Sequence, residues 1–330
     1  MNWTSPWRKA SAVVTSAALC LTGSLWAQEA TVPAAAEQAI ARGLEYLEKT
    51  QRPDGSWGSP PEYSTALTSL SVLAYLACGH LPGRGRYGPQ VNRGIEYVLR
   101  SARPSGYIAV GSSNMYNHGL STLMLAEVLG ETERREVRDT LEKAVDLIIN
   151  TQNGRGGWRY QPRIADDDIS VTVMQVMALR AARNVGVDIP VETIDRAVAY
   201  VKSCANKDGG FAYQPGGGSG FARTGAGLCS LQVCGRYDAP ELQPGLNYLF
   251  AHKDDKDISF FFYGLYYSSY AVYQAGGEYW DSWYRDISQK LLVLQQKDGS
   301  WRGEAGSEYG TAMGVLVLAI PYRYLPIYQR

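Results

Sequence analysis

The stretch Arg42–Trp57, RGLEYLEKTQRPDGSW, decides the fold of this chain. It predicts an amphipathic helix, then a turn that contains Gly55, then a tryptophan. The same pattern returns as KAVDLIINTQNGRGGW at Lys143–Trp158 and as DISQKLLVLQQKDGSW at Asp286–Trp301. With three more degraded copies between them, the copies follow one another at intervals of about 50 residues, and a period of that size indicates a repeat architecture.

The degraded copies keep different parts of the pattern. The second keeps Arg93 and Gly94 but loses the Gln, and Tyr107 stands where the Trp is expected. The fourth has Phe211 in place of the Trp, and the fifth keeps Gly245 and then departs.

Each copy predicts a pair of helices with different surroundings. In the first helix of copy one, Ile40, Leu44 and Leu47 fall on one face and charged residues on the other, which is typical of a half-solvated helix. The second helices are apolar almost all round, as at 65–78, 171–182 and 311–320, so they are expected to be buried. Six outer helices around six inner ones predict an all-α, single (α/α)6 toroid. An open solenoid is the alternative, but neither end reads as a polar cap.

The pattern Arg/Lys-Gly-x-x-aromatic-Leu-x-x-x-Gln-x-x-x-Gly-x-Trp resembles the repeat of squalene–hopene and other terpenoid cyclases, whose superfamily includes the protein prenyltransferase β subunits. Copy one matches every position, and the resemblance covers about residues 36–330. It implies the toroid fold, with the Gln and Trp tying neighbouring repeats together. These motif residues therefore predict stability rather than activity.

The resemblance also implies chemistry that this chain carries only in part. Class II terpene cyclases protonate an alkene with a carboxylic acid on an Asp-x-Asp-Asp motif. Here the run is Ala165-Asp166-Asp167-Asp168, so the first Asp is absent. Either Asp167 or Asp168 is the candidate acid. The alternative is that Asp168 caps the helix that follows and its neighbours are first-turn charges.

The zinc chemistry of protein prenyltransferases is not expected. No Asp-x-Cys occurs in the sequence, and His80, His118 and His252 have no partner at metal-ligand spacing. The Cys-Gly-Glu-Gln motif of complement-type thioester toroids is absent too. We therefore expect no metal and no cofactor.

The amino ends of the inner helices are expected to surround one mouth of a central cavity, where an active site would lie. His118 is a candidate general base there, or a histidine that only bonds a neighbouring loop. The aromatic run 260–273 predicts either cavity lining or core. With Asp167, Asp168 and His118 as catalytic candidates, the candidate ligand-binding residues are Tyr63, Tyr116, Trp158, Tyr160, Tyr213, Arg223, Tyr263, Tyr267, Glu308 and Tyr309.

The amino-terminal residues predict export. Arg8-Lys9 precede the apolar run 10–25, and Ala27 offers a cleavage site, so residues 1–27 read as a secretory signal peptide. The run is short for a membrane span, and no stable span is expected after cleavage. Residues 28–35 read as a linker and 36–330 as the toroid. The net charge of zero, with 45% hydrophobic and 19% charged residues, offers no basic patch for nucleic acid.

Four cysteines remain after cleavage: Cys78, Cys204, Cys229 and Cys234. An even count in an exported chain permits two disulfides, but Cys229 and Cys234 point in different directions on one predicted helix. Buried free thiols are the alternative. The sequence specifies neither the pairing nor an oligomeric state.

Three functions fit these patterns. The first is an exported toroid that binds an apolar, isoprenoid-like ligand without a complete cyclase or zinc-prenyltransferase catalytic set. The second is an enzyme, either a reduced class II terpene cyclase (an isomerase or lyase) that uses the acidic run 166–168, or a glycan-active toroid. The third is an interaction scaffold whose cavity is filled by its own side chains.

Overall fold

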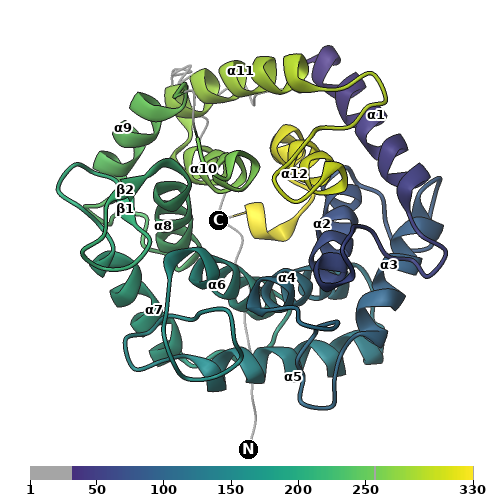
Figure 1. Ribbon diagram of the computed structural model, residues 1–330, viewed down its shortest axis with the longest axis horizontal. Coiled ribbons are helices and arrows are strands. Elements are labelled where there is room, and N and C mark those ends of the chain that lie inside the picture. The colour runs from purple at the N-terminus through teal and green to yellow at the C-terminus, as the bar shows by residue number, and fades with distance from the viewer. Residues whose placement is uncertain (1–31, 256–257, 330) are drawn as a thin grey trace, which may run out of the picture.

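The computed structural model describes residues 32–255 and 258–329 and holds twelve α-helices in two concentric rings (Figure 1). The outer helices are α1 (Ala34–Thr50), α3 (Gly88–Arg100), α5 (Arg135–Thr151), α7 (Val191–Ser203), α9 (Leu242–His252) and α11 (Gly277–Leu294). The inner helices are α2 (Ser64–Ala77), α4 (Met115–Glu131), α6 (Ile169–Asn184), α8 (Phe221–Val233), α10 (Phe261–Ala275) and α12 (Ser307–Ala319). This alternation confirms the (α/α)6 toroid, although α1 begins inside the predicted linker 28–35.

The two rings differ in burial as their sequence patterns predict. Every residue of α2 is buried, because outer helices, neighbouring inner helices and the ring centre enclose it. In α3 only one face is buried, formed by Val91, Ile95 and Val98 with two glycines. Among the described residues, no helix combines the length and the apolar character needed to cross a bilayer.

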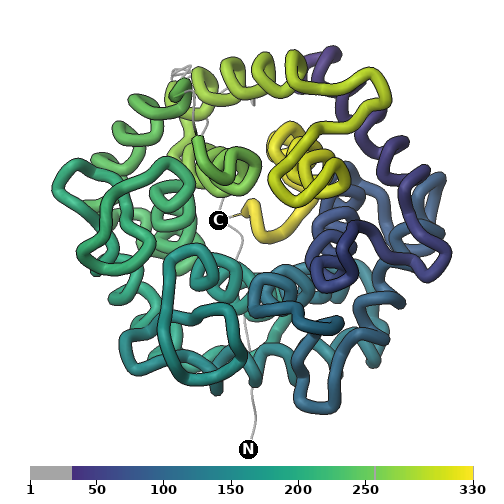
Figure 2. The backbone as a smooth tube through the Cα atoms, viewed as in Figure 1, coloured from purple at the N-terminus to yellow at the C-terminus, as the bar shows by residue number. Residues whose placement is uncertain are grey.

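The ring is closed. Each inner helix packs against the next, and α12 packs against both α2 and α1, so the last repeat meets the first. Figure 2 shows the chain returning to its starting helix at the upper right. Gln295 Nε2, at the end of α11, donates to Ala39 O of α1 at 2.8 Å. The open-solenoid alternative is therefore wrong.

The repeat glycines allow the close contacts between neighbouring repeats. Gly55 has φ +93°, and a Cβ there would lie 2.3 Å from the carbonyl oxygen of Arg93 in the next outer helix. Gly299 has φ +90°, and its Cβ would lie 2.5 Å from Arg42 O, across the closing junction. Only glycine tolerates both this backbone conformation and this approach.

The repeat tryptophan and glutamine bind backbone atoms. Trp301 is fully buried, and its Nε1 donates to Leu291 O at 2.8 Å.

In copy two, Gly106 has φ +85° and occupies the position of Gly55. The residue two positions later is Ile108, so the assignment of Tyr107 to the Trp position is wrong.

The connections divide the ring into two faces. The connections from outer to inner helices form what we call the loop face; the described ones include the 3-10 turn η1 (Pro61–Tyr63) and the short strands β1 (Phe211–Ala212) and β2 (Ser219–Gly220). The connections from inner to outer helices form the opposite face. There, residues 320–329 follow α12 and turn into the ring centre through the 3-10 turns η2 (Ile320–Tyr322) and η3 (Pro326–Tyr328), as Figure 1 shows in yellow. We call residues 320–329 the lumen segment.

All four cysteines in the described residues are free thiols. Cys204 and Cys229 are buried, and Cys78 and Cys234 are half-buried. Burial raises the pKa of the Cys204 thiol to about 11, which keeps it protonated at neutral pH. The structure realises the free-thiol alternative rather than a disulfide.

Candidate functional site at the mouth of the ring

On the loop face, loops cap the inner helix of the preceding repeat. An inner helix begins with backbone N–H groups that lack partners within the helix. For α4, α6 and α10, one such partner is an oxygen from the next loop along the ring. The contacts run from Met115 N to Tyr160 O (2.9 Å), from Ile169 N to Tyr213 O (3.0 Å) and from Phe262 N to Glu304 Oε1 (2.8 Å). These caps fix the loops, and with them Tyr160 and Tyr213, over the ring opening.

Four tyrosines meet at this opening, and we call Tyr116, Tyr160, Tyr213, Tyr263 and Asp168 the mouth cluster. The Tyr160 and Tyr213 hydroxyls are 2.5 Å apart, and the rings of Tyr116 and Tyr160 have centroids 5.9 Å apart. From the other side of the ring, Tyr263 Oη donates to Ser170 O of α6 at 3.2 Å. Burial and the Asp168 carboxyl raise the pKa of Tyr116, so this hydroxyl stays protonated. The cluster brings together α4, α6, α10 and two loops.

Asp168 is the acid of this cluster and is 0% exposed. Its Oδ1 caps α6 by accepting from Val171 N at 2.9 Å. Within the described residues, Oδ2 is buried without a close hydrogen bond, and Arg159 Nε lies 3.8 Å away. Burial raises the pKa of Asp168 to about 6, and the Val171 amide, the Tyr213 hydroxyl and Arg159 oppose that rise. Asp168 is therefore both a helix cap and a carboxyl that exchanges its proton near neutral pH.

Asp167 does not face the mouth. It is fully buried, and Arg155 binds it with two contacts, Nε to Oδ2 at 2.7 Å and Nη2 to Oδ1 at 2.8 Å. Asn153 Nδ2 donates to the same carboxylate at 2.5 Å. Both oxygens of this carboxylate are therefore engaged by residues of its own loop. The prediction of Asp167 as the acid is corrected: it anchors the loop 152–168.

His118 is also placed differently from the prediction. In four repeats, the N–H at the Trp position donates to a threonine of the inner helix: Trp57 to Thr68, Trp158 to Thr172, Phe211 to Thr224 and Trp301 to Thr311. In copy two, Ile108 N donates to His118 Nδ1 at 3.2 Å. The proton is then on Nε2, which donates to Ala144 O at 3.1 Å. His118 is 0% exposed, and burial lowers its pKa to about 4, so it is a structural residue rather than a general base at the mouth.

The other candidates lie at several depths. Trp158 is 2% exposed and binds Ile148 O, so it is a packing residue. Tyr267 is 1% exposed and lies below Tyr263, with ring centroids 4.7 Å apart. Arg223 donates to Ser219 O of its own repeat. On the loop face, Tyr63 is 45% exposed, whereas Glu308 and Tyr309 are half-buried at the start of α12.

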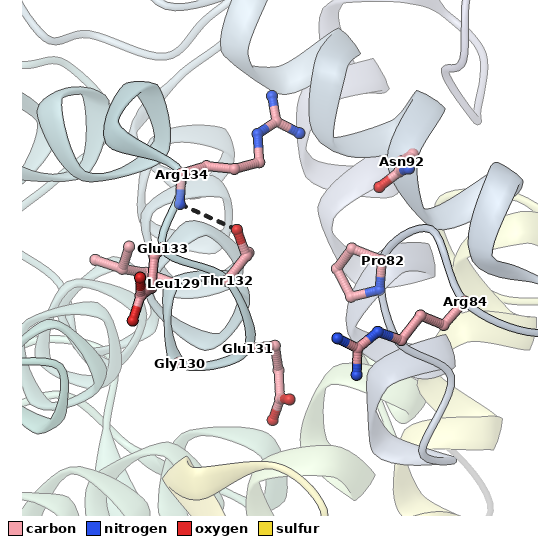
Figure 3. Close-up of a pocket in the computed structure, with 9 residues that line it drawn as sticks. All are labelled: Pro82, Arg84, Asn92, Leu129, Gly130, Glu131, Thr132, Glu133 and Arg134. Carbon is pink, nitrogen blue, oxygen red and sulfur yellow. Dashed lines mark hydrogen bonds between the residues drawn. The ribbon is translucent and has the colours of Figure 1, made fainter.

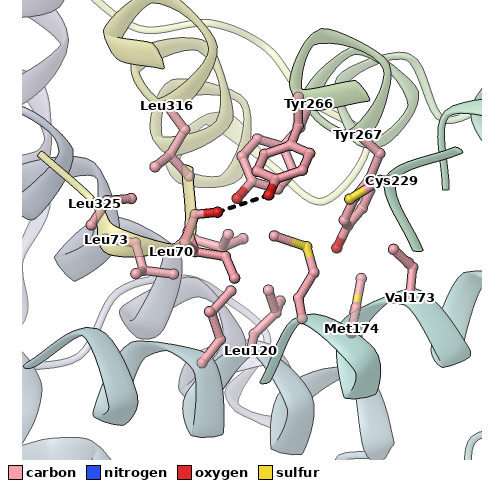
Figure 4. Packing of buried hydrophobic residues seen from close by; sticks show 14 of the residues in the cluster. Leu70, Leu73, Leu120, Val173, Met174, Cys229, Tyr266, Tyr267, Leu316 and Leu325 are labelled. Carbon is pink, nitrogen blue, oxygen red and sulfur yellow. Dashed lines mark hydrogen bonds between the residues drawn. The ribbon is translucent and has the colours of Figure 1, made fainter. Parts of the chain in front are cut away.

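Below the mouth, side chains of the inner helices fill the ring centre. Figure 4 shows Leu70, Leu120, Met174, Tyr267 and Leu316 converging from five inner helices. All five are at most 5% exposed. A ligand that enters from the loop face therefore meets the mouth cluster first and a packed apolar layer beneath it.

Grooves also lie at the rim of the ring. On the opposite face, a groove of 760 Å³ lies between the end of α4 and the connection from α2 to α3, lined by polar groups such as Arg84, Asn92 and Arg134 (Figure 3). Beside the start of α10, a groove of 620 Å³ is lined partly by Phe261, Phe262 and Leu294. The second groove is the more apolar and lies by the Phe262 cap described above.

Sequence reasoning missed Arg159, Ser170 and Glu304 at this site. Arg159 directly follows the repeat tryptophan, and Glu304 lies three residues after Trp301, so both belong to the loops that cap preceding helices. For Arg159 and Glu304, the signal that could have found them is position relative to the repeat tryptophan, because the residues after Trp158 and Trp301 contact the preceding inner helix.

Comparison with protein families gives one clear match. The model of the prenyltransferase alpha-alpha toroid domain matches residues 66–264. Among curated proteins, drimenyl diphosphate synthase of Streptomyces showdoensis is 28% identical over 181 residues, which are 54% of this chain and 32% of that protein. The enzyme of the same name from Streptantibioticus cattleyicolor is 25% identical over 182 residues. The match thus spans about a third of the length of these relatives.

Solved structures share the fold at low identity. A variant of the type II terpene cyclase MstE from Scytonema, with merosterolic acid A as product, has a TM-score of 0.61 at 14% identity over 89% of this chain and 98% of that one. Another variant of it was solved with geranylgeranyl dihydroxybenzoate as substrate. Cellobiose 2-epimerase from Bacillus thermoamylovorans B4167 has a TM-score of 0.66 at 12% identity, over 87% of this chain and 98% of that one. At such identities these likenesses show the fold alone.

Proposed function

Because the chain belongs to the prenyltransferase alpha-alpha toroid family, we propose that it is an exported protein that binds an apolar, isoprenoid-like molecule at the mouth of its ring. The mouth cluster is the observation that carries this proposal. Aromatic rings from several repeats meet there over a packed apolar layer, and an isoprenoid chain offers the matching apolar surface.

Exposed apolar groups on the loop face support the same site. Ile164 is 69% exposed, Phe260 68%, Tyr63 45% and Tyr160 37%, and each lies on a loop that leads to an inner helix. Apolar side chains gathered around an opening are typical of a binding surface. The MstE structures hold an isoprenoid-derived substrate and product in the same fold, which is consistent with this ligand class.

Replacing Tyr160 by Ala tests the mouth. Tyr160 stacks against Tyr116 and bonds Tyr213, so its loss removes the centre of the aromatic surface. We expect farnesol, titrated by intrinsic fluorescence, to bind Tyr160→Ala about fivefold to thirtyfold more weakly than the unaltered chain, since one aromatic contact contributes about 1 to 2 kcal/mol. Tyr237→Ala is the matched control, because Tyr237 is 38% exposed against 37% for Tyr160 but lies on the opposite face.

The same preparation identifies the natural ligand class. Protein purified from an exporting host is extracted with organic solvent, and the extract is analysed by mass spectrometry. A stoichiometric isoprenoid or other apolar lipid supports the proposal. Equal farnesol affinity in Tyr160→Ala and Tyr237→Ala contradicts it. The intact mass also tests export, because cleavage after Ala27 makes Gln28 the first residue.

A second function, acid catalysis of the type II cyclase kind, is favoured by one observation. Asp168 carries a buried oxygen without a close hydrogen bond beside the mouth tyrosines. A protonated carboxyl there can give its proton to an alkene held against the rings, and the rings stabilise the resulting cation. MstE, a type II terpene cyclase, is a chain of comparable size that aligns with this one over 98% of its length, so that cyclase has a single ring of helices.

Asp168→Asn separates catalysis from binding. Asparagine keeps the cap on Val171, because its side-chain oxygen accepts the same hydrogen bond. We expect turnover of an added polyprenyl substrate, followed by gas chromatography, to fall at least a hundredfold, as is usual for loss of a general acid. Above about pH 6, the turnover of the unaltered chain falls up to tenfold per unit as Asp168 loses its proton.

Asp254→Asn is the control for this measurement, since Asp254 is an exposed loop-face residue paired with Lys253 and Lys290. Turnover that survives in Asp168→Asn would refute the catalytic role. Retained farnesol binding in that variant, without any turnover in the unaltered chain, would leave binding as the function.

A further inference from the structure

The lumen segment closes the ring centre at the opposite face. After α12 the backbone reverses at Arg323, which has φ +58°, and η3 then packs against α4 and α6. Leu325, Ile327 and Tyr328 are 2%, 1% and 1% exposed, so three large side chains enter the ring centre. Figure 4 shows Leu325 beside Leu73, with Tyr266 across the lumen. The segment is thus the floor beneath the packed layer.

Polar side chains of the inner helices hold this segment by its backbone. Tyr270 Oη donates to Ile327 O at 2.7 Å, and Gln274 Nε2 donates to Tyr328 O at 2.8 Å. On the other side, the Glu127 carboxyl of α4 accepts from the Ile327 amide. These contacts hold the main chain of the η3 turn rather than its side chains.

One of these contacts works against a permanently docked segment. Glu127 is 3% exposed, and its Oε2 has no hydrogen-bond partner within the part of the chain that the structure describes. Burial raises its pKa to about 8, and the ionisable groups around it are Glu131 on α4, Tyr266 on α10 and Tyr328 on the segment. Docking of the lumen segment therefore holds the Glu127 carboxyl away from water and in its uncharged form, which costs free energy.

We propose that the floor of the ring is a receptor for a short peptide segment, occupied in cis by residues 320–329, and that this segment is a plug whose release opens the ring centre. The segment lies outside the six helical pairs, so the ring closes without it. The proposal rests on the proposed isoprenoid-binding function only for the identity of the ligand that would enter the ring centre. Release exposes Leu73, Tyr266 and their neighbours, which form the lower side of the packed apolar layer beneath the mouth cluster.

Cys229 reports opening without any isoprenoid. It is 0% exposed and lies among the lumen residues with Tyr267 and Val173 (Figure 4). Methyl methanethiosulfonate reacts with a thiolate that it can reach: the cysteine gains a methylthio group through a new S–S bond, and methanesulfinate leaves. Peptide mapping by mass spectrometry gives the rate at Cys229 relative to Cys204, a buried thiol outside the lumen.

Tyr270→Phe removes the donor to Ile327 O and keeps the ring. We expect the rate at Cys229, relative to Cys204, to rise about fivefold, the change expected for one lost hydrogen bond. Tyr284→Phe is the matched control, because Tyr284 Oη also donates to a backbone carbonyl at 2.8 Å, but that carbonyl, Leu318 O, belongs to α12 and not to the plug. That variant should leave the relative rate unchanged.

Glu127→Gln is expected to lower the reaction rate at Cys229, whereas Tyr270→Phe raises it. Glutamine keeps an acceptor for the Ile327 amide but has no charged form to suppress. In the unaltered chain, opening should grow with pH between about 4.5 and 8, by up to tenfold per unit, because the released Glu127 loses its proton more readily than the docked one. The Cys229 rate of the unaltered chain, divided by that of Glu127→Gln at each pH, should rise across this window. Glu131→Gln, on the same helix, should leave that rise in place.

The plug is overturned if Tyr270→Phe and Tyr284→Phe give the same relative rate, or if the rates at Cys229 and Cys204 rise together, which indicates general unfolding. A ratio to Glu127→Gln that stays flat with pH also counts against it. None of these readouts involves an isoprenoid. A failure of farnesol to bind therefore refutes the proposed function while the thiol rates still decide the plug.

Discussion

A chain that carries Gly299→Ala is expected to lose about 3 kcal/mol of its free energy of unfolding. Two effects add. The backbone at Gly299 has φ +90°, which costs a residue with a Cβ about 1 to 2 kcal/mol. The new Cβ would also lie 2.5 Å from Arg42 O, a backbone atom that can move only if α1 shifts away from the last repeat. The substitution thus forces open the junction that closes the ring.

Gly216→Ala separates the two effects. Gly216 has φ +82° but no atom within 4 Å of the added Cβ, so only the backbone cost of about 1 to 2 kcal/mol applies. Guanidinium chloride unfolding of both variants, followed by circular dichroism, gives the comparison. Equal losses would mean that the junction between the first and last repeats tolerates the shift and does not hold the ring closed tightly.

His118→Ala is expected to cost about 4 kcal/mol, because it leaves the buried Ile108 N–H and Ala144 O without partners and opens a cavity. His118→Thr should recover the part of that loss that comes from the Ile108 N–H. Threonine accepts the same kind of N–H in four other repeats, from Trp57, Trp158, Phe211 and Trp301. A general base would show the reverse: little change in stability and no rescue by threonine.

The pH dependence of stability tests the same residue. Burial lowers the His118 pKa to about 4, against 6.5 in the unfolded chain. Between these values, the unfolded chain takes up a proton that the folded protein does not, so His118 lowers stability by about 3 kcal/mol as the pH falls from 6.5 to 4. The difference between the unaltered chain and His118→Thr should therefore grow in favour of the threonine variant as the pH falls. A difference independent of pH would contradict the buried, neutral imidazole.

The sequence was sufficient for the architecture because the repeat residues act locally. Gly55 and Trp57 make the same turn in several copies, and apolar residues all round α2 leave it no stable place except the inside. The site was harder to predict, since its residues are placed by neighbouring repeats. Asp167 and Asp168 are adjacent in sequence, yet Arg155 binds one and the mouth tyrosines surround the other.

His118 shows a second limit. The copies differ in the number of residues between the Trp position and the inner helix, so the equivalence of His118 with Thr68 is hidden until the turns are superposed on their glycines. The lumen segment shows a third. Leu325 and Ile327 belong to no repeat, and an apolar residue outside a periodic pattern does not indicate which surface it will cover.

Closure of the ring has a consequence for how the chain folds. Arg42 and Gln295, hydrogen-bonded across the closing junction, are 253 positions apart in the sequence. Contacts between such distant residues form late, because the entropy lost in closing the long intervening loop is not offset until both ends are already structured. Until then, the apolar surfaces of α2 and α12 lack their neighbours. The partly assembled arc is therefore the species most prone to aggregate, and the rate of its last step determines how long that species persists.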